Sequence, residues 1–341
     1  MLKKVYSTIL LASLAICARG QELTVPQLSQ YIADNPFLMS PTYAGIGDHI
    51  KVRLNGLTQW VGIEDAPDTQ TLAADARIGN RSGIGMLLYN DSNGYTRQRG
   101  ARVSFAHHLT LDRYDDIFLS FGISYNFNQF RIDVEEFEEN NGQLPTDDKA
   151  TTNHNFDIGV LYRYDKFFFS LNAGNILNKD LSNFNTDMIQ IEPNKLRNYY
   201  VYSGYSFSKS KNSKLEIEPS VFFQWFESDG RSVTDLNTKF RFRDFEDYYY
   251  VGLTYRFLND QLGEPLYIAP IAGFKKSNFY FGYSYQVITN EILGYSSGTH
   301  VLTVGMDLFQ GISNCRCMYW FDRFCPIFAL SFNSRLWERL G

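Results

Sequence analysis

The sequence lacks long apolar runs after its first twenty residues, since no stretch of about 18 apolar residues follows them. This excludes a membrane-spanning helix in that part of the chain. Histidine is scarce, with five residues, and no His-rich metal site is apparent. The formal net charge is only -5 and no basic stripe occurs, so nucleic acid is not an expected partner.

Catalytic motifs are also missing. The chain contains no Gly-rich phosphate loop and no Gly-x-Ser-x-Gly element. His107 and His108 are adjacent on a predicted strand, so they point to opposite faces and cannot easily share a metal ion. We therefore predict no catalytic residues, no metal and no cofactor, and a protein that is not an enzyme.

The N-terminus has the pattern of a secretory signal peptide. Lys3 and Lys4 precede a short apolar core, and Ala18 and Gly20 supply the small residues that signal peptidase requires. The expected signal peptide covers residues 1–20, and Gln21 begins the mature chain.

Aromatic residues are abundant, with 28 Phe and 23 Tyr, although mean hydropathy is negative. This combination favours a β-rich protein. Over residues 116–127 the side chains alternate between an apolar face and a small, polar face. The apolar face carries Ile117, Leu119, Phe121, Ile123 and Tyr125. The same alternation recurs over residues 167–174, 249–256 and 279–286.

About fourteen such segments occur, each near the ten residues that a tilted membrane strand needs. We predict an all-β fold, a transmembrane antiparallel up-and-down β-barrel of about fourteen strands over residues 50–309. The alternative is a soluble β-sandwich, but its outer face would be polar, whereas these strands would expose Phe and Tyr to water. The expected strand starts are near Ile50, Thr69, Gly83, Arg99, Asp116, Asn153, Lys166, Asn198, Leu215, Ser232, Asp247, Leu266, Asn278 and Thr299.

One segment carries charged residues on its alternating face. A lipid-facing Lys or Arg costs roughly 2–4 kcal/mol at mid-bilayer, so this face is predicted to line the lumen. It consists of Val233, Asp235, Asn237, Lys239 and Arg241. Phe118 and Tyr250 also fall on lumen faces, which suggests that the lumen is partly filled.

The lengths of the connections favour an outer-membrane barrel. If the mature N-terminus is periplasmic, the two longest connections, around residues 128–152 and 176–197, are odd-numbered and face outside, while the even ones are mostly short. We therefore expect long extracellular loops and both termini in the periplasm. The acidic residues of the long connections form either a solvated face or a contact surface for a basic partner or divalent cations. They include Glu135, Glu136, Glu138, Glu139, Asp147, Asp148, Asp180, Asp187 and Glu192.

The most unusual residues lie in the first quarter of the mature chain. They form a Gln-Tyr element, then an element ending in Tyr-Ala-Gly, and then an Arg…Gln-Trp…Pro-x-Thr element. The residues are Gln30, Tyr31, Asn35, Pro36, Pro41, Tyr43, Ala44, Gly45, Arg53, Gln59, Trp60, Gly62, Pro67 and Thr69. This order resembles the PorP/SprF family of type IX secretion system membrane proteins of Bacteroidetes. The chain departs from the family's Asn-Pro-Ala-Tyr-Ala-Gly element with Ser40 and Thr42 at the Asn and Ala positions.

The resemblance implies a non-enzymatic outer-membrane protein that assists type IX secretion. Family members help to deliver or hold large adhesins through a C-terminal secretion domain, and some contact the translocon or its periplasmic ring. The chain looks closer to SprF, which is paired with a gliding adhesin. The competing function is a transport channel for small solutes, which requires an open lumen.

The motif residues admit a structural explanation as well as a partner-binding one. Asn35-Pro36 and Ser40-Pro41 favour extended or turn backbone. Tyr43-Ala44-Gly45 would let the segment 21–49 enter the barrel with close packing. Trp60 falls at the outer end of the first strand, where Trp often marks the membrane interface.

Cysteines cluster in the tail, residues 310–341. Cys315, Cys317 and Cys325 allow at most one internal disulfide, with Cys325 pairing to either of the other two in the oxidising envelope. A zinc site would need a fourth ligand, and no His follows Cys325. The apolar tail could pack under the barrel, add a strand or bind a periplasmic partner. Cys17 follows Ile16, which is larger than the residue that normally precedes a lipidated Cys, so lipidation is the less favoured alternative.

Overall fold

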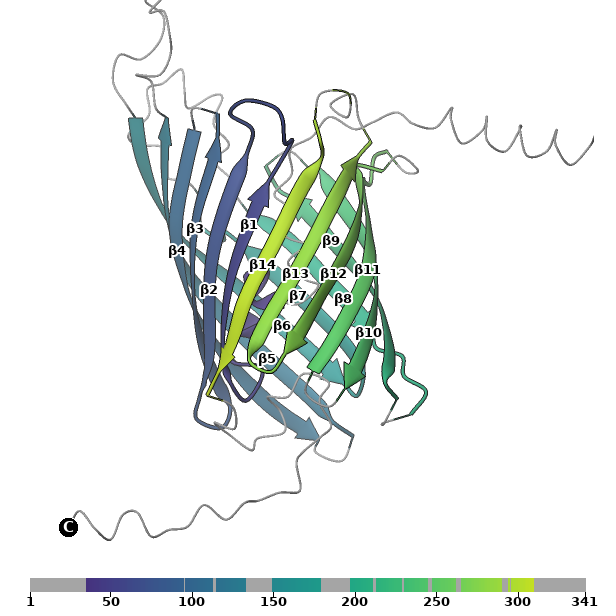
Figure 1. Ribbon diagram of the computed structural model, residues 1–341. Helices are drawn as coiled ribbons and strands as arrows, with labels where there is room; N and C mark the ends of the chain where they lie inside the picture. Colours follow the sequence, from purple (N-terminus) through teal and green to yellow (C-terminus); the bar gives the residue numbers. More distant parts are fainter. Residues whose placement is uncertain are drawn as a thin grey trace, which may run out of the picture.

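Fourteen antiparallel strands form one closed barrel, in which each strand pairs with its sequence neighbours and β1 pairs with β14 (Figure 1). This computed structural model describes residues 35–94, 96–112, 115–132, 149–178, 197–210, 213–228, 230–244, 247–261, 265–289, 294 and 296–309. The predicted all-β, up-and-down barrel is confirmed. The strands are β1 Ile50–Thr58, β2 Asp68–Ile78, β3 Ser82–Asn93, β4 Thr96–Asp112, β5 Ile117–Ile132, β6 Lys149–Tyr164, β7 Phe167–Gly174, β8 Asn198–Tyr205, β9 Leu215–Phe226, β10 Ser232–Asp244, β11 Asp247–Leu258, β12 Tyr267–Lys276, β13 Phe279–Ile288 and β14 Thr299–Leu308.

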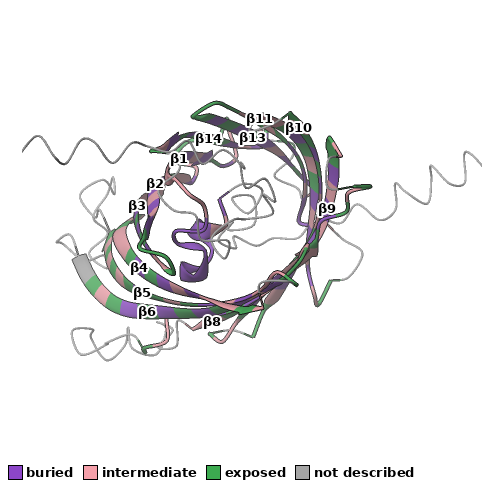
Figure 2. Cartoon of the chain, turned by 90° about the horizontal axis from the view of Figure 1, so that it is seen from below, coloured by how far each residue is buried: buried purple, intermediate pink, exposed green. Residues whose placement is uncertain are grey.

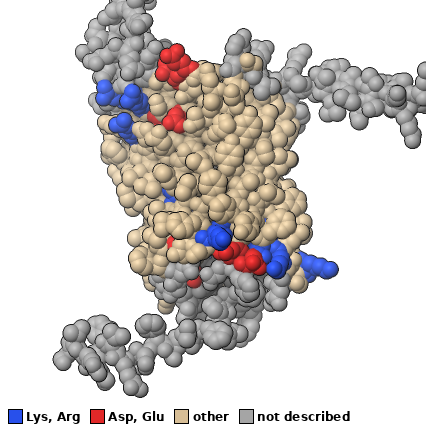
Figure 3. All heavy atoms as spheres, in the orientation of Figure 1, with Lys and Arg blue, Asp and Glu red and all other residues tan. Residues whose placement is uncertain are grey.

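The period-two pattern places apolar side chains on the outside of the wall. Phe121 and Ile123 of β5 are exposed, while Phe118 and Ser120 on the opposite face are buried inside the barrel. Figure 3 shows the result as a largely uncharged band around the middle of the wall, with charged side chains towards its two ends. Such a band is the surface that a bilayer requires of a barrel. Among the described residues no helix is long and apolar enough to cross a membrane.

Strand direction alternates, so the odd-numbered connections lie at one end of the barrel, the odd end. The even-numbered connections lie at the other, the even end, together with the start of β1 and the end of β14. The even connections include the short turns 79–81, 165–166 and 277–278. The acidic residues named above for the two long odd connections fall within 133–148 and 179–196, outside the described residues.

Residues 35–49, here called the inner segment, run inside the barrel before β1. They contain two short 3-10 helices, η2 Pro36–Leu38 and η3 Pro41–Tyr43. Each helix has a proline at its start, where a missing N–H costs nothing, and the Ser40 side chain caps the second by accepting from the Thr42 amide. Figure 2 shows these helices as a buried body within the ring of strands.

The inner segment forms the hydrophobic core of the lumen. Its apolar side chains pack against inward-facing side chains from strands on both sides of the ring. Phe37, Met39 and Tyr43 rank among the largest side chains that are fully buried. Buried Leu161, Phe168 and Phe222 of the wall belong to the same cluster. A lumen that would otherwise be polar thus gains a local apolar core, which holds this part of the chain by the hydrophobic effect.

Candidate functional site in the barrel lumen

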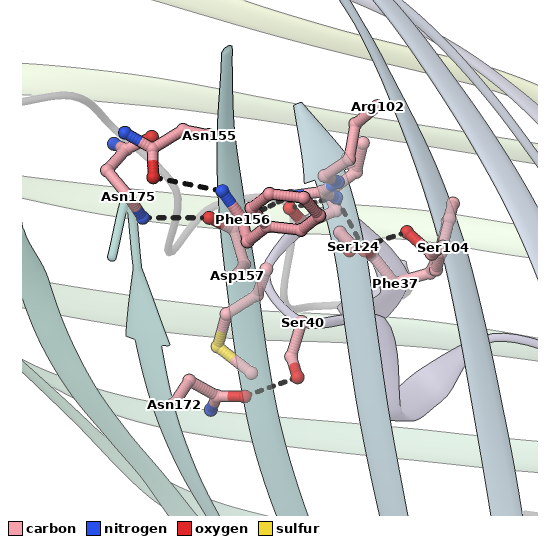
Figure 4. A network of polar contacts seen from close by, with 12 residues as sticks. Phe37, Ser40, Arg102, Ser104, Ser124, Asn155, Phe156, Asp157, Asn172 and Asn175 are labelled. Carbon is pink, nitrogen blue, oxygen red and sulfur yellow. Dashed lines mark hydrogen bonds and ion pairs between the residues drawn. The ribbon is translucent and has the colours of Figure 1, made fainter. Parts of the chain in front are cut away.

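Barrel side chains hold the backbone of the inner segment directly. Arg102 of β4 donates from one terminal nitrogen to the carbonyl oxygens of Phe37 at 2.9 Å and Leu38 at 2.8 Å (Figure 4). Its guanidinium also lies over the Phe37 ring at 5.6 Å and 3.9 Å from the Asp157 carboxylate. Carbonyls of irregular backbone need partners when they are buried, and Arg102 supplies charged donors to two of them.

Three further wall residues hold the backbone in the same way. Tyr200 of β8 donates to the Met39 carbonyl at 2.5 Å. His108 of β4 donates from Nε2 to the Ala44 carbonyl at 3.0 Å, since a carbonyl can only accept. Asp75 of β2 accepts from the Gly45 amide at 2.9 Å. These contacts come from three different strands, so the inner segment is fixed to the wall along much of its length.

Side-chain contacts complete the attachment. Ser40 donates to the amide oxygen of Asn172 on β7, and Figure 4 shows the two side chains pointing toward each other. Thr42 lies within 2.8 Å of the Ser40 hydroxyl. Burial raises the pKa of the Tyr43 phenol above its ordinary value, against the lowering effect of the Ser170 hydroxyl, so Tyr43 stays neutral.

Small residues form the part of the wall that the inner segment touches. They occupy one register row across β3 to β6, consisting of Gly83, Ala106, Gly122 and Gly159. A Cβ atom on Gly83 would lie 2.1 Å from the Ala44 carbonyl oxygen, and one on Gly122 would lie 2.5 Å from the Thr42 amide nitrogen. Gly45 adopts a φ of 71°, in the left-handed region that favours glycine. Backbone therefore packs on backbone at this contact.

A charged cluster joins the inner segment to the seam where the barrel closes. Asp307 of β14 accepts from Arg53 of β1 at 2.7 Å and lies 2.9 Å from the Lys275 ammonium of β12. His49, the last residue before the first strand, is 3.2 Å from the same carboxylate. Arg53 also lies 4.7 Å above the Tyr280 ring. This seam cluster ties β1, β12 and β14 to the base of the inner segment.

A second set of ion pairs lines β9 to β11. Asp235 accepts two bonds from Arg256, the residue directly opposite it, at 2.6 and 3.2 Å. Lys239 pairs with Glu218 at 3.1 Å, again directly opposite. The predicted lumen position of this charged face is confirmed, because Asp235 and Lys239 are buried while Leu236 is exposed. Among the described residues, no group of three or more His, Cys, Asp or Glu could hold a metal ion.

A comparison with known protein families assigns the chain to one of them. The model of the type IX secretion system membrane protein family PorP/SprF matches residues 20–306. The chain belongs to the PorP/SprF family. A search of curated proteins found no matching relative.

Solved structures with a similar fold are other barrels. The monoaromatic hydrocarbon channel CymD is 10% identical with a TM-score of 0.49, over 86% of this chain and 96% of that one. The toluene transporter TbuX of Ralstonia pickettii is 9% identical with a TM-score of 0.47, over 80% and 93%. The outer membrane protein Omp33 of Acinetobacter baumannii is 9% identical with a TM-score of 0.43, over 77% and 99%.

The residues predicted from the PorP/SprF resemblance fall into two places. The first group builds the inner segment and the seam cluster. Asn35 precedes η2, and Pro36 and Pro41 start the two 3-10 helices. The members of this group are Asn35, Pro36, Pro41, Tyr43, Ala44, Gly45 and Arg53.

The second group builds the β1–β2 connection at the odd end. Trp60 and Gly62 have positive φ angles of 48° and 104°. The Gln59 amide donates to the Pro67 carbonyl at 2.8 Å, closing the connection on itself. Thr69 donates to the Asp91 carboxylate on β3. The two groups are thus separated into a lumen site and a rim site.

Some predicted residues lie outside the described residues, and others were missed. Gln30 and Tyr31, together with Cys315, Cys317 and Cys325, belong to the undescribed ranges. The wall residues that hold the inner segment did not stand out in the sequence. They are Asp75, Arg102, His108, Asn172 and Tyr200.

Replacing Arg102 with methionine should loosen η2 without unfolding the barrel. Methionine keeps an apolar stem but removes two charge-assisted bonds to carbonyls, each worth about 1.5–3 kcal/mol. Hydrogen exchange of the Met39 and Ser40 amides should therefore accelerate about tenfold or more. Arg99→Met, on the same strand but exposed, is the matched control. Equal exchange in the two variants would show that Arg102 does not hold the segment.

Proposed function

We propose that this outer-membrane barrel assists type IX secretion by holding a secreted adhesin at the cell surface through the adhesin's C-terminal secretion domain. Membership of the PorP/SprF family supports a role in secretion. The observation that carries the anchoring role is the inner segment, whose backbone is held by Arg102, His108 and Tyr200 inside the lumen. A channel for small solutes needs an open lumen. Here the inner segment occupies the part of the lumen that faces β4 to β6 (Figure 2).

The proposed topology follows from the connections. Residues 1–20 act as the signal peptide, residues 21–49 lead into the barrel, and the even end with the 310–341 tail faces the periplasm. The odd end then faces outside, as short periplasmic turns and longer extracellular loops are usual in such barrels. The tail and the even end are the proposed contacts for translocon or periplasmic ring components.

The odd end is the proposed contact for the adhesin. The β1–β2 connection there carries Gln59 and Trp60 and is bonded to the segment that precedes β14. The Val61 amide donates to the Gly298 carbonyl at 3.0 Å, and the Ser297 amide donates to the Val61 carbonyl at 2.7 Å. A rim connection fixed in this way offers a partner a preformed surface, which lowers the entropic cost of binding. Within the family we favour the SprF type, with a gliding adhesin as cargo.

Deleting the gene should abolish surface display of one adhesin while other type IX cargo is still released. The physical reason is that an anchor serves only the chain it holds, whereas the translocon serves all cargo. Surface labelling of intact cells with antibody against the adhesin measures display, and mass spectrometry of the culture medium measures general secretion. Restoring the wild-type gene is the control.

Normal adhesin display in the deletion strain would refute the anchoring function. Co-purification from native outer membranes then identifies the partner. Reconstituted into liposomes, the intact chain should show no conductance for small solutes. Steady conductance of the wild-type protein would favour the channel function instead.

A further inference from the structure

Three arginines gather on the outer face of the wall at its odd end. Arg97 of β4 pairs directly with Arg131 of β5 across the strands, and Arg99 follows on the same face of β4. All three are exposed. Figure 3 shows blue basic groups together at the upper left of the wall, above its uncharged band. This set, called the arginine patch, places three positive charges close together on the outer face of the wall.

The arginine patch lies at the edge of the apolar band. Towards the middle of the wall, the outward residues of the same strands are apolar or aromatic, among them Val103 on β4 and Phe127 on β5, both exposed. At the same level as Val103 and Phe127, on the outer face, the Tyr125 hydroxyl bonds His154, and the two rings stack with centroids 5.9 Å apart. Tyr and His at this level are typical of a membrane–water interface, where one end of a side chain is apolar and the other is hydrated. The arginines therefore stand at headgroup level.

Amide side chains surround the patch. Asn90 of β3 accepts from Nε of Arg99 at 2.8 Å, which uses one donor of that guanidinium and fixes its stem. Gln129 lies directly opposite Arg99 and is exposed. Gln70 continues the same row beyond Asn90. Guanidinium groups bind phosphate through paired N–H donors, and amides suit the hydroxyls of a sugar.

We propose that the arginine patch binds the phosphate groups of an anionic glycolipid in the outer leaflet of the membrane. The guanidinium groups of Arg97, Arg99 and Arg131 pair with the phosphates, and the neighbouring amides contact the sugar. The proposal rests on the topology given above, in which the odd end faces outside. It adds to the anchoring function a lipid contact that fixes the barrel's depth and orientation.

The test titrates the purified full chain, in zwitterionic detergent, with bisphosphorylated lipid A and follows bound lipid by native mass spectrometry. Lipid A stripped of both phosphates should bind at least tenfold more weakly. The variant Arg97→Gln/Arg99→Gln/Arg131→Gln should lose binding to the same extent. The matched control removes three exposed lysines at the even end, Lys209→Gln/Lys214→Gln/Lys276→Gln, and should bind like the wild type.

Several outcomes would overturn the proposal. Equal binding of the two lipids, or equal loss in the arginine and lysine variants, would show that the patch does not select lipid phosphate. Full competition by inorganic phosphate at the same phosphate concentration would assign the patch to a free anion. Binding that appears only after Glu135, Glu136, Glu138 and Glu139 are changed to Gln would make the chain's own acidic connection the occupant. Single Arg99→Gln leaves the opposed pair intact and should give a partial loss if the triple variant fails to fold.

Discussion

Replacing Asp235 with alanine should destabilise the barrel more than any change to a surface charge. Arg256 is fully buried, and both its bonds to Asp235 would be lost. Removing one partner of a buried pair leaves an uncompensated charge and costs about 3–5 kcal/mol. Urea unfolding in detergent micelles, followed by tryptophan fluorescence, should show this as a lower midpoint with an unchanged slope.

Two further variants distinguish the buried charge from a general effect of mutation. Asp244→Ala removes the partner of Lys214 in an exposed pair on the same side of the barrel, and should cost only about 0–1 kcal/mol. The double variant Asp235→Leu/Arg256→Met removes both charges and should recover most of the loss, since apolar residues of similar size often replace a buried pair without penalty. A loss in the double variant as large as in the single one would mean that Arg256 is not the cause.

The barrel itself could be predicted because the alternation of apolar and polar residues can be read within each strand. Alternation places Phe121 and Ile123 outside and Ser120 inside, whatever the neighbouring strand does. All predicted strand starts lie within four residues of the observed ones. The largest deviations are at β4 and β6, which begin before the predicted Arg99 and Asn153. The added residues are Thr96-Arg97-Gln98 and Lys149-Ala150-Thr151-Thr152, in which no apolar residue alternates with a polar one over more than one position, so alternation gives no signal.

The lumen site could not be predicted in the same way, because its contacts are distant in sequence. Ser40 meets Asn172, which is 132 residues away, and Tyr200 meets Met39 at a separation of 161. The inner segment also has no period of two or 3.6, since proline and capping set its two 3-10 turns. The motif spacing suggested close packing near Tyr43-Ala44-Gly45, but not which wall would receive it.

One signal in the sequence could have located that wall. Gly83, Gly122 and Gly159 fall on lumen faces, where larger residues would fill the interior of a barrel. Their significance appears only when the register aligns them with Ala106 in a single row. Register depends on pairing between strands, so a pattern within one strand cannot reveal it.

Replacing Gly83 with valine should drive the inner segment out of its position while the barrel stays closed. A Cβ would stand 2.1 Å from the Ala44 carbonyl oxygen and 2.7 Å from the Gly45 Cα, and both atoms are backbone that cannot rotate away. Overpacking of this kind costs about 1–3 kcal/mol, and valine favours the strand itself. The strain therefore falls on the inner segment rather than on β3.

A buried reporter measures this displacement. Ser40→Cys, in a background with Cys315, Cys317 and Cys325 changed to Ser, should react slowly with a thiol reagent because Ser40 is fully buried. Adding Gly83→Val should raise the rate at least about tenfold. Gly56→Val on β1 is the matched control, because a Cβ there meets nothing within 4 Å.

Conductance connects this displacement to function. If the inner segment closes the lumen, liposomes carrying Gly83→Val should conduct small ions while the Gly56→Val barrel stays silent. Equal labelling and equal conductance in both variants would mean that the segment does not depend on the glycine row. The inner segment would then not be what closes the lumen, and the anchoring function would lose its main structural support.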